Sequence, residues 1–157
     1  MDFYDETIMN WLEKKCADAS MPSGLYRMEI TETSYAAIEA DRSATLEALR
    51  EAGILLLLDD FGSGYSSFGM LQNYNFDIMK IDMSFVRQIE TNAKTRSIIR
   101  FIIEMAHTME IKIIAEGAET KEQVEFLRDN GCDYIQGYYF YKPMPEEEFV
   151  KLLDAGR

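Results

Sequence analysis

Apolar side chains recur along this chain with two different periods, and the two periods alternate from one end to the other. Short, densely apolar runs predict strands, whereas stretches with an apolar residue every three or four positions predict amphipathic helices. The predicted strands span residues 25–31, 55–58, 78–82, 111–115 and 134–136. The predicted helices span residues 3–17, 42–52, 68–72, 93–109 and 120–130, and a last helix begins at 145. This alternation predicts an α/β fold with a parallel sheet and right-handed connections.

The run of four leucines at residues 55–58 is the most informative of these strands. It is apolar on both faces, which is typical of a buried parallel strand. We expect it to end abruptly in Asp59 and Asp60, before a loop that contains Gly62 and Gly64. Adjacent carboxylates at such a place repel each other and lose hydration, and a divalent cation with oxygen ligands would remove that cost. The alternative is that Asp60 caps the following helix and Asp59 is solvated.

The other predicted strands also carry a polar residue at or near their carboxyl end. The five residues are Glu29, Asp59, Lys80, Glu116 and Gln136. The carboxyl ends of parallel strands lie on one face of a barrel or sheet, so these side chains can converge. We therefore expect a functional site at that face. For Lys80, a buried ion pair with Asp59 or Asp82 is an alternative that is compatible with such a site.

Composition and charge narrow the class of protein. The 157 residues suffice for one domain with a substantial core. With 28 acidic and 16 basic residues the net charge is −12, which argues against passive binding to nucleic acid or to an anionic membrane. An acidic site that handles a phosphate compound needs metal ions to screen its charge.

Two further features indicate the compartment. No apolar run has the length of a membrane span, and no signal peptide is evident at the N-terminus, so we expect no membrane segment in this chain. Cys16 and Cys132 show no metal-ligand spacing, so we expect free thiols in a reducing cytoplasm.

Five strings at the strand ends resemble the EAL-domain family, the bacterial metal-dependent phosphodiesterases that linearise cyclic di-GMP. The strings are MEITET (28–33), DDFGSGYSS (59–67), DIMKID (77–82), AEGAET (115–120) and QGYYF (136–140). Their order and spacing are similar to the C-terminal part of that domain. The resemblance implies an α/β fold, an incomplete TIM-type (β/α) barrel of about five parallel strands with flanking helices. It also implies that residues 1–157 form a single truncated domain that contains barrel strands four to eight.

The resemblance assigns roles to individual residues. Glu29, Asp59, Asp60 and Glu116 match metal ligands for Mg²⁺ or Mn²⁺, with Asp59 bridging two ions and Ca²⁺ inhibitory. The matching catalytic residues are Lys80, Glu116 and Asp59. These roles imply hydrolysis of cyclic di-GMP to linear pGpG by water attack assisted by two metals.

The remaining matches concern the substrate and the loops. Gln136 and Asp82 match substrate-binding positions. The positions that support the loops match Glu32, Gly62, Gly64 and Glu119.

The sequence departs from the family pattern at its start. The glutamate-alanine-leucine motif and an upstream strand that ends in an asparagine ligand are absent, so three of eight strands and two ligands of the first metal are not found. We therefore expect weak metal binding and a weakly active or inactive isolated chain. Because the outer strands would have open edges, we also expect a homodimer or a complementing barrel segment. The alternative function is an inactive module for cyclic di-GMP binding, dimerisation or regulation. A different magnesium-dependent barrel, such as an enolase-like enzyme, fits the string at 59–67 poorly.

Two other features carry weaker signals. His107, the single histidine, falls inside a predicted helix and is expected on its surface rather than among ligands. The aromatic residues 138–141 are expected to pack on the protein, with stacking on a guanine base as the alternative.

Overall fold

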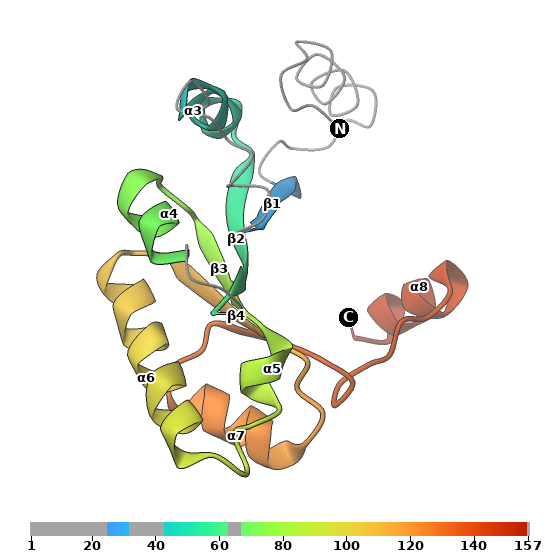
Figure 1. The fold of residues 1–157 in the computed structure, drawn as a ribbon. Coiled ribbons are helices and arrows are strands. Elements are labelled where there is room, and N and C mark those ends of the chain that lie inside the picture. The colour runs from blue at the N-terminus through green and yellow to red at the C-terminus, as the bar shows by residue number, and fades with distance from the viewer. Residues whose placement is uncertain (1–24, 32–42, 63–66, 157) are drawn as a thin grey trace.

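The computed structural model of the protein describes residues 25–31, 43–62 and 67–156 (Figure 1). Five strands form one sheet in which every neighbouring pair is parallel. The strands are β1 (Arg27–Thr31), β2 (Leu55–Phe61), β3 (Ile78–Ile81), β4 (Lys112–Glu116) and β5 (Tyr134–Gln136). Strands that follow one another in the chain are also neighbours in the sheet, which is the order found in a (β/α) barrel.

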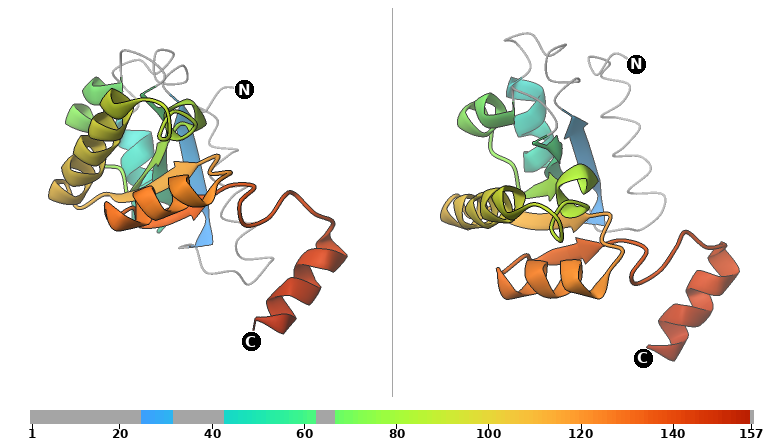
Figure 2. Two further views of the ribbon diagram at one scale, coloured as in Figure 1. Left: turned by 90° about the horizontal axis from the view of Figure 1, so that it is seen from below. Right: turned by 60° about the horizontal axis from the view of Figure 1, so that its bottom comes forward.

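Helices connect the strands, as the sequence predicted. They are α3 (Ser43–Glu51), α4 (Ser67–Asn73), α5 (Met83–Val86), α6 (Ala93–Thr108), α7 (Lys121–Asp129) and α8 (Glu146–Ala155). In Figures 1 and 2, α4, α6 and α7 cover the same side of the sheet. The one-turn helix α5 was not predicted, and the helix predicted at 3–17 lies outside the described residues.

Local sequence signals set several helix ends. Thr120 and Gln123 form the predicted capping box at the start of α7. Asn92 accepts hydrogen bonds from the first amides of α6. After α3, Gly53 has a φ of 81°, a left-handed conformation that glycine adopts without steric cost.

Side chains alternate between the two faces of each strand, and the two faces of the sheet have different neighbours. One face packs with α3, α4, α6 and α7 in the main core and contributes Ile30, Leu56, Leu58, Met79, Ile81, Ile113 and Ala115. The opposite face carries a small apolar cluster of Leu57, Ile78 and Ile114. This second face is the inner side of the curved sheet. The predicted site residues follow the small cluster on this face, toward the carboxyl ends of the strands.

Strand β2 continues past the leucines, contrary to the prediction that it ends abruptly in Asp59 and Asp60. It runs to Phe61, and its pairing with β3 shifts between Leu58 and Phe61. At this irregularity Asp60 has a φ of 55°, a conformation that aspartate tolerates better than most residues. Phe61 is fully buried and closes the strand against the main core. The two carboxylates thus lie inside a bulged strand end, and the strand continues for one residue beyond them.

Helix α8 stands apart from the sheet in both figures. Its three leading glutamates lie at the positive end of the helix dipole, as predicted. None of its residues is buried, and Phe149, Val150 and Leu153 are about half exposed. Among the helices that the structure describes, none combines the length and the apolar character needed to cross a bilayer.

Candidate functional site

Strand register brings four of the predicted residues to the inner face of the sheet. One of them pairs in register with Leu57 of the small apolar cluster, and each of the other three lies two positions after a member of that cluster. The four are Glu29, Asp59, Lys80 and Glu116. Because residues two apart on a strand share a face, their side chains project to the same side of four neighbouring strands.

Lys80 joins the other three. Its Nζ atom lies 2.9 Å from Glu29 Oε1, 3.0 Å from Asp59 Oδ1 and 2.9 Å from Glu116 Oε1. The Lys80 side chain is 9% exposed, whereas that of Glu29 is 51% exposed. Asp59 Oδ1 also accepts a hydrogen bond from the Asp60 amide at 2.9 Å. Three carboxylates from three strands therefore share one buried ammonium group.

The charges of this cluster hold Lys80 in its protonated form. Burial alone would lower the pKa of Lys80, but hydrogen bonds to Glu29, Glu116 and Asp59 outweigh burial and raise the pKa above its ordinary value. The ion pair with Asp59, which was the alternative for Lys80, is present together with two further pairs. The Asp59 side chain is only 15% exposed, so the alternative of a solvated Asp59 is wrong.

Asp60 belongs to the same electrostatic environment. Burial, followed by the negative charges of Asp59, Asp82 and Glu29, raises the pKa of Asp60, while Lys80 partly opposes this effect. Helix α4 begins only at residue 67, so Asp60 does not cap it. A carboxylate in such surroundings favours a positive partner.

The other predicted residues lie around this cluster with different contacts. Asp82 caps α5 by accepting a hydrogen bond from the Ser84 amide at 2.9 Å. Glu119 pairs with Arg87 at 3.2 Å. Gln136 ends β5 in register with Glu116 and is exposed. Gly62 follows β2 directly and has a φ of 98°, and both Glu32 and Gly64 lie outside the described residues.

The donor set fits a divalent cation in its chemistry. Carboxylate oxygens are the ligands that Mg²⁺ and Mn²⁺ prefer, and the Lys80 ammonium marks a position where three of them already bind positive charge. Within residues 25–31, 43–62 and 67–156, no three Asp, Glu, His or Cys side chains form a group that would hold a metal as they stand. A metal would therefore share these carboxylates with Lys80.

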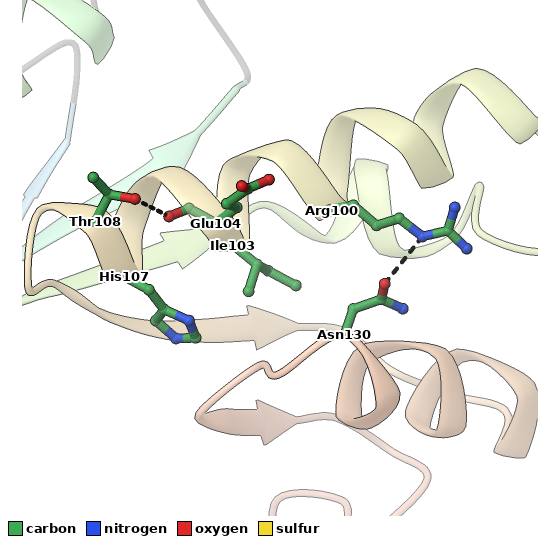
Figure 3. Close-up of a pocket in the computed structure, with 6 residues that line it drawn as sticks. All are labelled: Arg100, Ile103, Glu104, His107, Thr108 and Asn130. Atoms are coloured by element: carbon green, nitrogen blue, oxygen red, sulfur yellow. Dashed lines mark hydrogen bonds between the residues drawn. The ribbon is translucent and has the colours of Figure 1, made fainter.

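A cavity elsewhere in the molecule is separate from this cluster. It measures about 640 Å³ and lies between α6 and the end of α7 (Figure 3). Arg100 Nε donates to Asn130 Oδ1 across it at 3.0 Å. His107 lines the cavity and contacts Asp133 Oδ2 at 3.0 Å, on the helix surface where it was predicted. The Thr108 hydroxyl donates to the Glu104 carbonyl at 2.9 Å on the same wall.

The aromatic residues after β5 are more exposed than predicted. Tyr138, Tyr139, Phe140 and Tyr141 are each at least 41% exposed. Tyr139 and Phe140 contact each other edge to face, with ring centroids 5.2 Å apart. The expectation that they pack on the protein is not met in the described part of the chain.

The chain is similar to known proteins in sequence and in fold. A family model described as EAL domain matches residues 1–143. The chain is 38% identical over 139 residues to the cyclic di-GMP phosphodiesterase NbdA of Pseudomonas aeruginosa, a match that covers 88% of this chain and 18% of NbdA. The chain spans about a fifth of the length of the curated relatives it matches.

Solved structures agree with the predicted fold class. The crystal structure of the EAL domain of Mycobacterium smegmatis DcpA superposes with a TM-score of 0.91 at 30% identity, covering 99% of this chain and 70% of that one. Klebsiella pneumoniae BlrP1, in a manganese and cyclic di-GMP complex, superposes with a TM-score of 0.81 at 29% identity, covering 87% and 35% of the two chains. The predicted α/β fold with an incomplete TIM-type barrel is confirmed.

Proposed function

The chain belongs to the EAL-domain family, and we propose that it carries part of the site of a phosphodiesterase that hydrolyses cyclic di-GMP to linear pGpG. The observation that carries this proposal is the convergence of Glu29, Asp59 and Glu116 on Lys80 at the carboxyl ends of neighbouring strands. Residues 1–157 would then belong to one domain, whose five described strands correspond to strands four to eight of the family barrel.

Each residue has a distinct part in the proposed mechanism. A phosphodiester is an anion, so a rim of carboxylates repels it unless positive charge intervenes. Glu29, Asp59, Asp60 and Glu116 would hold the divalent ions, Mg²⁺ or Mn²⁺. When bound, such ions supply positive charge at the phosphate and acidify a coordinated water.

The protein's own side chains contribute beyond holding the metals. Lys80 adds a fixed positive charge near the negative charge that develops on the phosphate. Glu116 would orient the attacking water and accept its proton. Gln136 and Asp82 would contact the substrate, and Glu32, Gly62, Gly64 and Glu119 would support the loops.

A second function is favoured by one observation. Lys80 pairs with all three carboxylates at once and offsets part of their negative charge, so the cluster can serve as a recognition surface. Under this alternative the chain binds cyclic di-GMP or mediates dimerisation without hydrolysing it. Weak metal binding and low activity of the isolated chain are expected under the first proposal as well.

Two further proposals concern the cellular compartment of the chain and the partner that covers its open sheet edges. A cytoplasmic location suits Cys132, which has no disulfide partner in the described residues and would stay reduced there. The outer strands β1 and β5 have no further sheet neighbour among the described strands. We infer that a second copy of the chain or a complementing barrel segment covers these edges.

Incubation with cyclic di-GMP and either Mn²⁺ or Mg²⁺, followed by quantification of pGpG, tests the proposal. We expect slow turnover in the wild type that disappears in Asp59→Ala. Asp129→Ala serves as a control, because this aspartate is 63% exposed and pairs with the surface residue Arg128. Binding of cyclic di-GMP without turnover would support the module instead, and the lack of both would contradict hydrolysis and cyclic di-GMP binding alike.

A further inference from the structure

Helix α5 lies between the two chain segments that carry most of the acidic cluster. It follows β3, the strand of Lys80, and Figure 1 shows it beside the ends of the neighbouring strands. On one side is the end of β2, with Asp59 and Asp60. On the other side is the segment that follows Glu116, the last residue of β4. The contacts of α5 with these two segments are unusually close.

On the β2 side, the contact is between Gly62 and Phe85. A Cβ atom at Gly62 would lie 2.7 Å from Phe85 Cε2, closer than two carbon atoms approach without repulsion. The backbone that leaves β2 is therefore in direct contact with the aromatic ring. Phe85 itself packs against the main core, and this packing holds its ring in place.

On the β4 side, three contacts follow one another. A Cβ atom at Gly117 would lie 2.5 Å from Met83 Cβ. Arg87 Nη2 lies 3.2 Å from Glu119 Oε1, and the Thr120 hydroxyl donates to Glu90. Residues 117–120, which continue directly from Glu116, are thus held by Met83 of α5 and by Arg87 and Glu90, which follow the helix.

The helix has its own anchors, which make it a rigid support. Asp82 caps its first turn at 2.9 Å. Val86 and Ile89 are completely buried. The Gln88 side chain donates from Nε2 to the Ser84 carbonyl at 3.0 Å. A single turn is too short to be stable alone, so these anchors determine where it lies.

We propose that α5 is a positioning element that fixes the distance between the Asp59–Asp60 pair and Glu116 across Lys80. Phe85 is the positioning residue for the β2 side, and Arg87 is the positioning residue for the β4 side. The inference rests on the proposed function, because it concerns how metal ligands are placed. Each residue acts through the segment that it contacts: Phe85 through the backbone at Gly62, and Arg87 through the side chain of Glu119.

The test compares Phe85→Ala, Phe85→Leu and Arg87→Ala by hydrogen–deuterium exchange and by Mn²⁺ titration. Phe85→Ala should accelerate exchange in residues 59–62, and Arg87→Ala should do so in residues 116–120. Each should weaken Mn²⁺ affinity about tenfold, as loss of supporting contacts around a metal site commonly does. Phe85→Leu, which restores an apolar contact, should recover most of the affinity.

Matched controls separate positioning from general destabilisation. Phe101→Ala removes a ring that is 61% exposed on α6, and Arg128→Ala removes an exposed guanidinium paired with its neighbour Asp129. Both controls should leave exchange at the two segments and Mn²⁺ affinity unchanged. Urea unfolding of every variant identifies any change in global stability.

Two results would overturn the inference. One is exchange at both segments equal to that of the controls. The other is accelerated exchange with unchanged Mn²⁺ affinity, which would make α5 a purely structural support. If the wild type binds no Mn²⁺ at all, the proposed function fails, while the exchange comparison still decides whether α5 holds the two segments.

Discussion

Lys80 is the residue on which the inner face of the sheet depends most directly. A buried ammonium group between three carboxylates compensates charges that would otherwise repel one another. The position of Lys80 in a strand is visible in the sequence. The sequence suggested Asp59 as one partner and placed Glu29 and Glu116 on the same face. Contact of all three with Lys80 depends on strand register, because Glu29 is 51 positions away along the chain.

Replacing Lys80 with Met should therefore destabilise the fold. We expect the free energy of unfolding in urea to fall by about 3 kcal/mol, because removal of one partner leaves buried charges uncompensated. Lys121→Met, which breaks an exposed helix pair with Glu125, should cost less than about 0.5 kcal/mol. Equal effects of the two substitutions would show that the Lys80 contacts contribute little.

Asp133 lies where β4 and β5 begin, at the opposite end of these strands from Glu116 and Gln136. Burial alone would raise the pKa of Asp133, but hydrogen bonds from Lys112, His107 and the Ile113 amide outweigh burial and lower the pKa. A carboxyl whose pKa is lowered by folding stabilises the protein above its unfolded pKa, and this contribution disappears as the pH falls through the folded value.

Asp133→Asn tests that contribution. At pH 7 the variant should be about 2 kcal/mol less stable than the wild type, since hydrogen bonds to a charged group are lost. The difference should narrow as the pH falls below about 4. Urea titrations across this range measure it, with the exposed Asp129→Asn as the control. A difference independent of pH would mean that the charge of Asp133 is not what stabilises this end.

At the scale of elements, the turn after β5 depends on a close backbone contact. A Cβ atom at Gly137 would lie 2.1 Å from the Ala118 carbonyl oxygen. The Ala118 amide donates to the Gln136 carbonyl at 3.2 Å, and the Tyr139 amide donates to the Ala118 carbonyl at 3.0 Å. The segment after β4 and the segment after β5 are therefore joined at Gly137.

Gly137→Ala should break that junction and reduce the free energy of unfolding by about 2 kcal/mol, because the added methyl group meets backbone that cannot move aside. Gly69→Ala is the matched comparison, since the methyl group there meets no atom within 4 Å and the site lies in α4. It should stabilise the protein by about 0.5 kcal/mol. Thermal or urea unfolding measures both, and a neutral Gly137→Ala would contradict the close contact.

Sequence periodicity was sufficient for most elements and for the identity of the strand-end residues. The apolar stripe of α6 and the capping box of α7 are local signals, so both helices could be predicted to within a residue or two. The continuation of β2 to Phe61 could not, because it depends on pairing with β3. Helix α5 escaped prediction because its four residues are too few for a period and are held by tertiary contacts.

At the scale of the whole molecule, apolar surface remains exposed at the β5 end of the sheet. The exposed residues there and on α8 include Tyr134, Tyr138, Phe140, Tyr141, Phe149, Val150 and Leu153. Exposed apolar side chains and an open sheet edge are features that proteins commonly cover by association.

Light scattering after gel filtration, over a range of concentrations, tests this expectation. We predict a mass above the 18.1 kDa of one chain, and a decrease toward that value in the double variant Phe149→Glu, Leu153→Glu. Ile98→Glu, at an exposed position on α6, should not change the mass. A monodisperse monomer at all concentrations would make the prediction of self-association wrong.

The central claim is that carboxylates from separate strands meet at one rim and bind divalent cations there. Electron paramagnetic resonance of free Mn²⁺, titrated with wild type and with Asp59→Asn, measures this directly. We predict that the wild type removes the free-ion signal and that the variant binds at least about tenfold more weakly. Equal binding by both proteins, or none by the wild type, would contradict the claim.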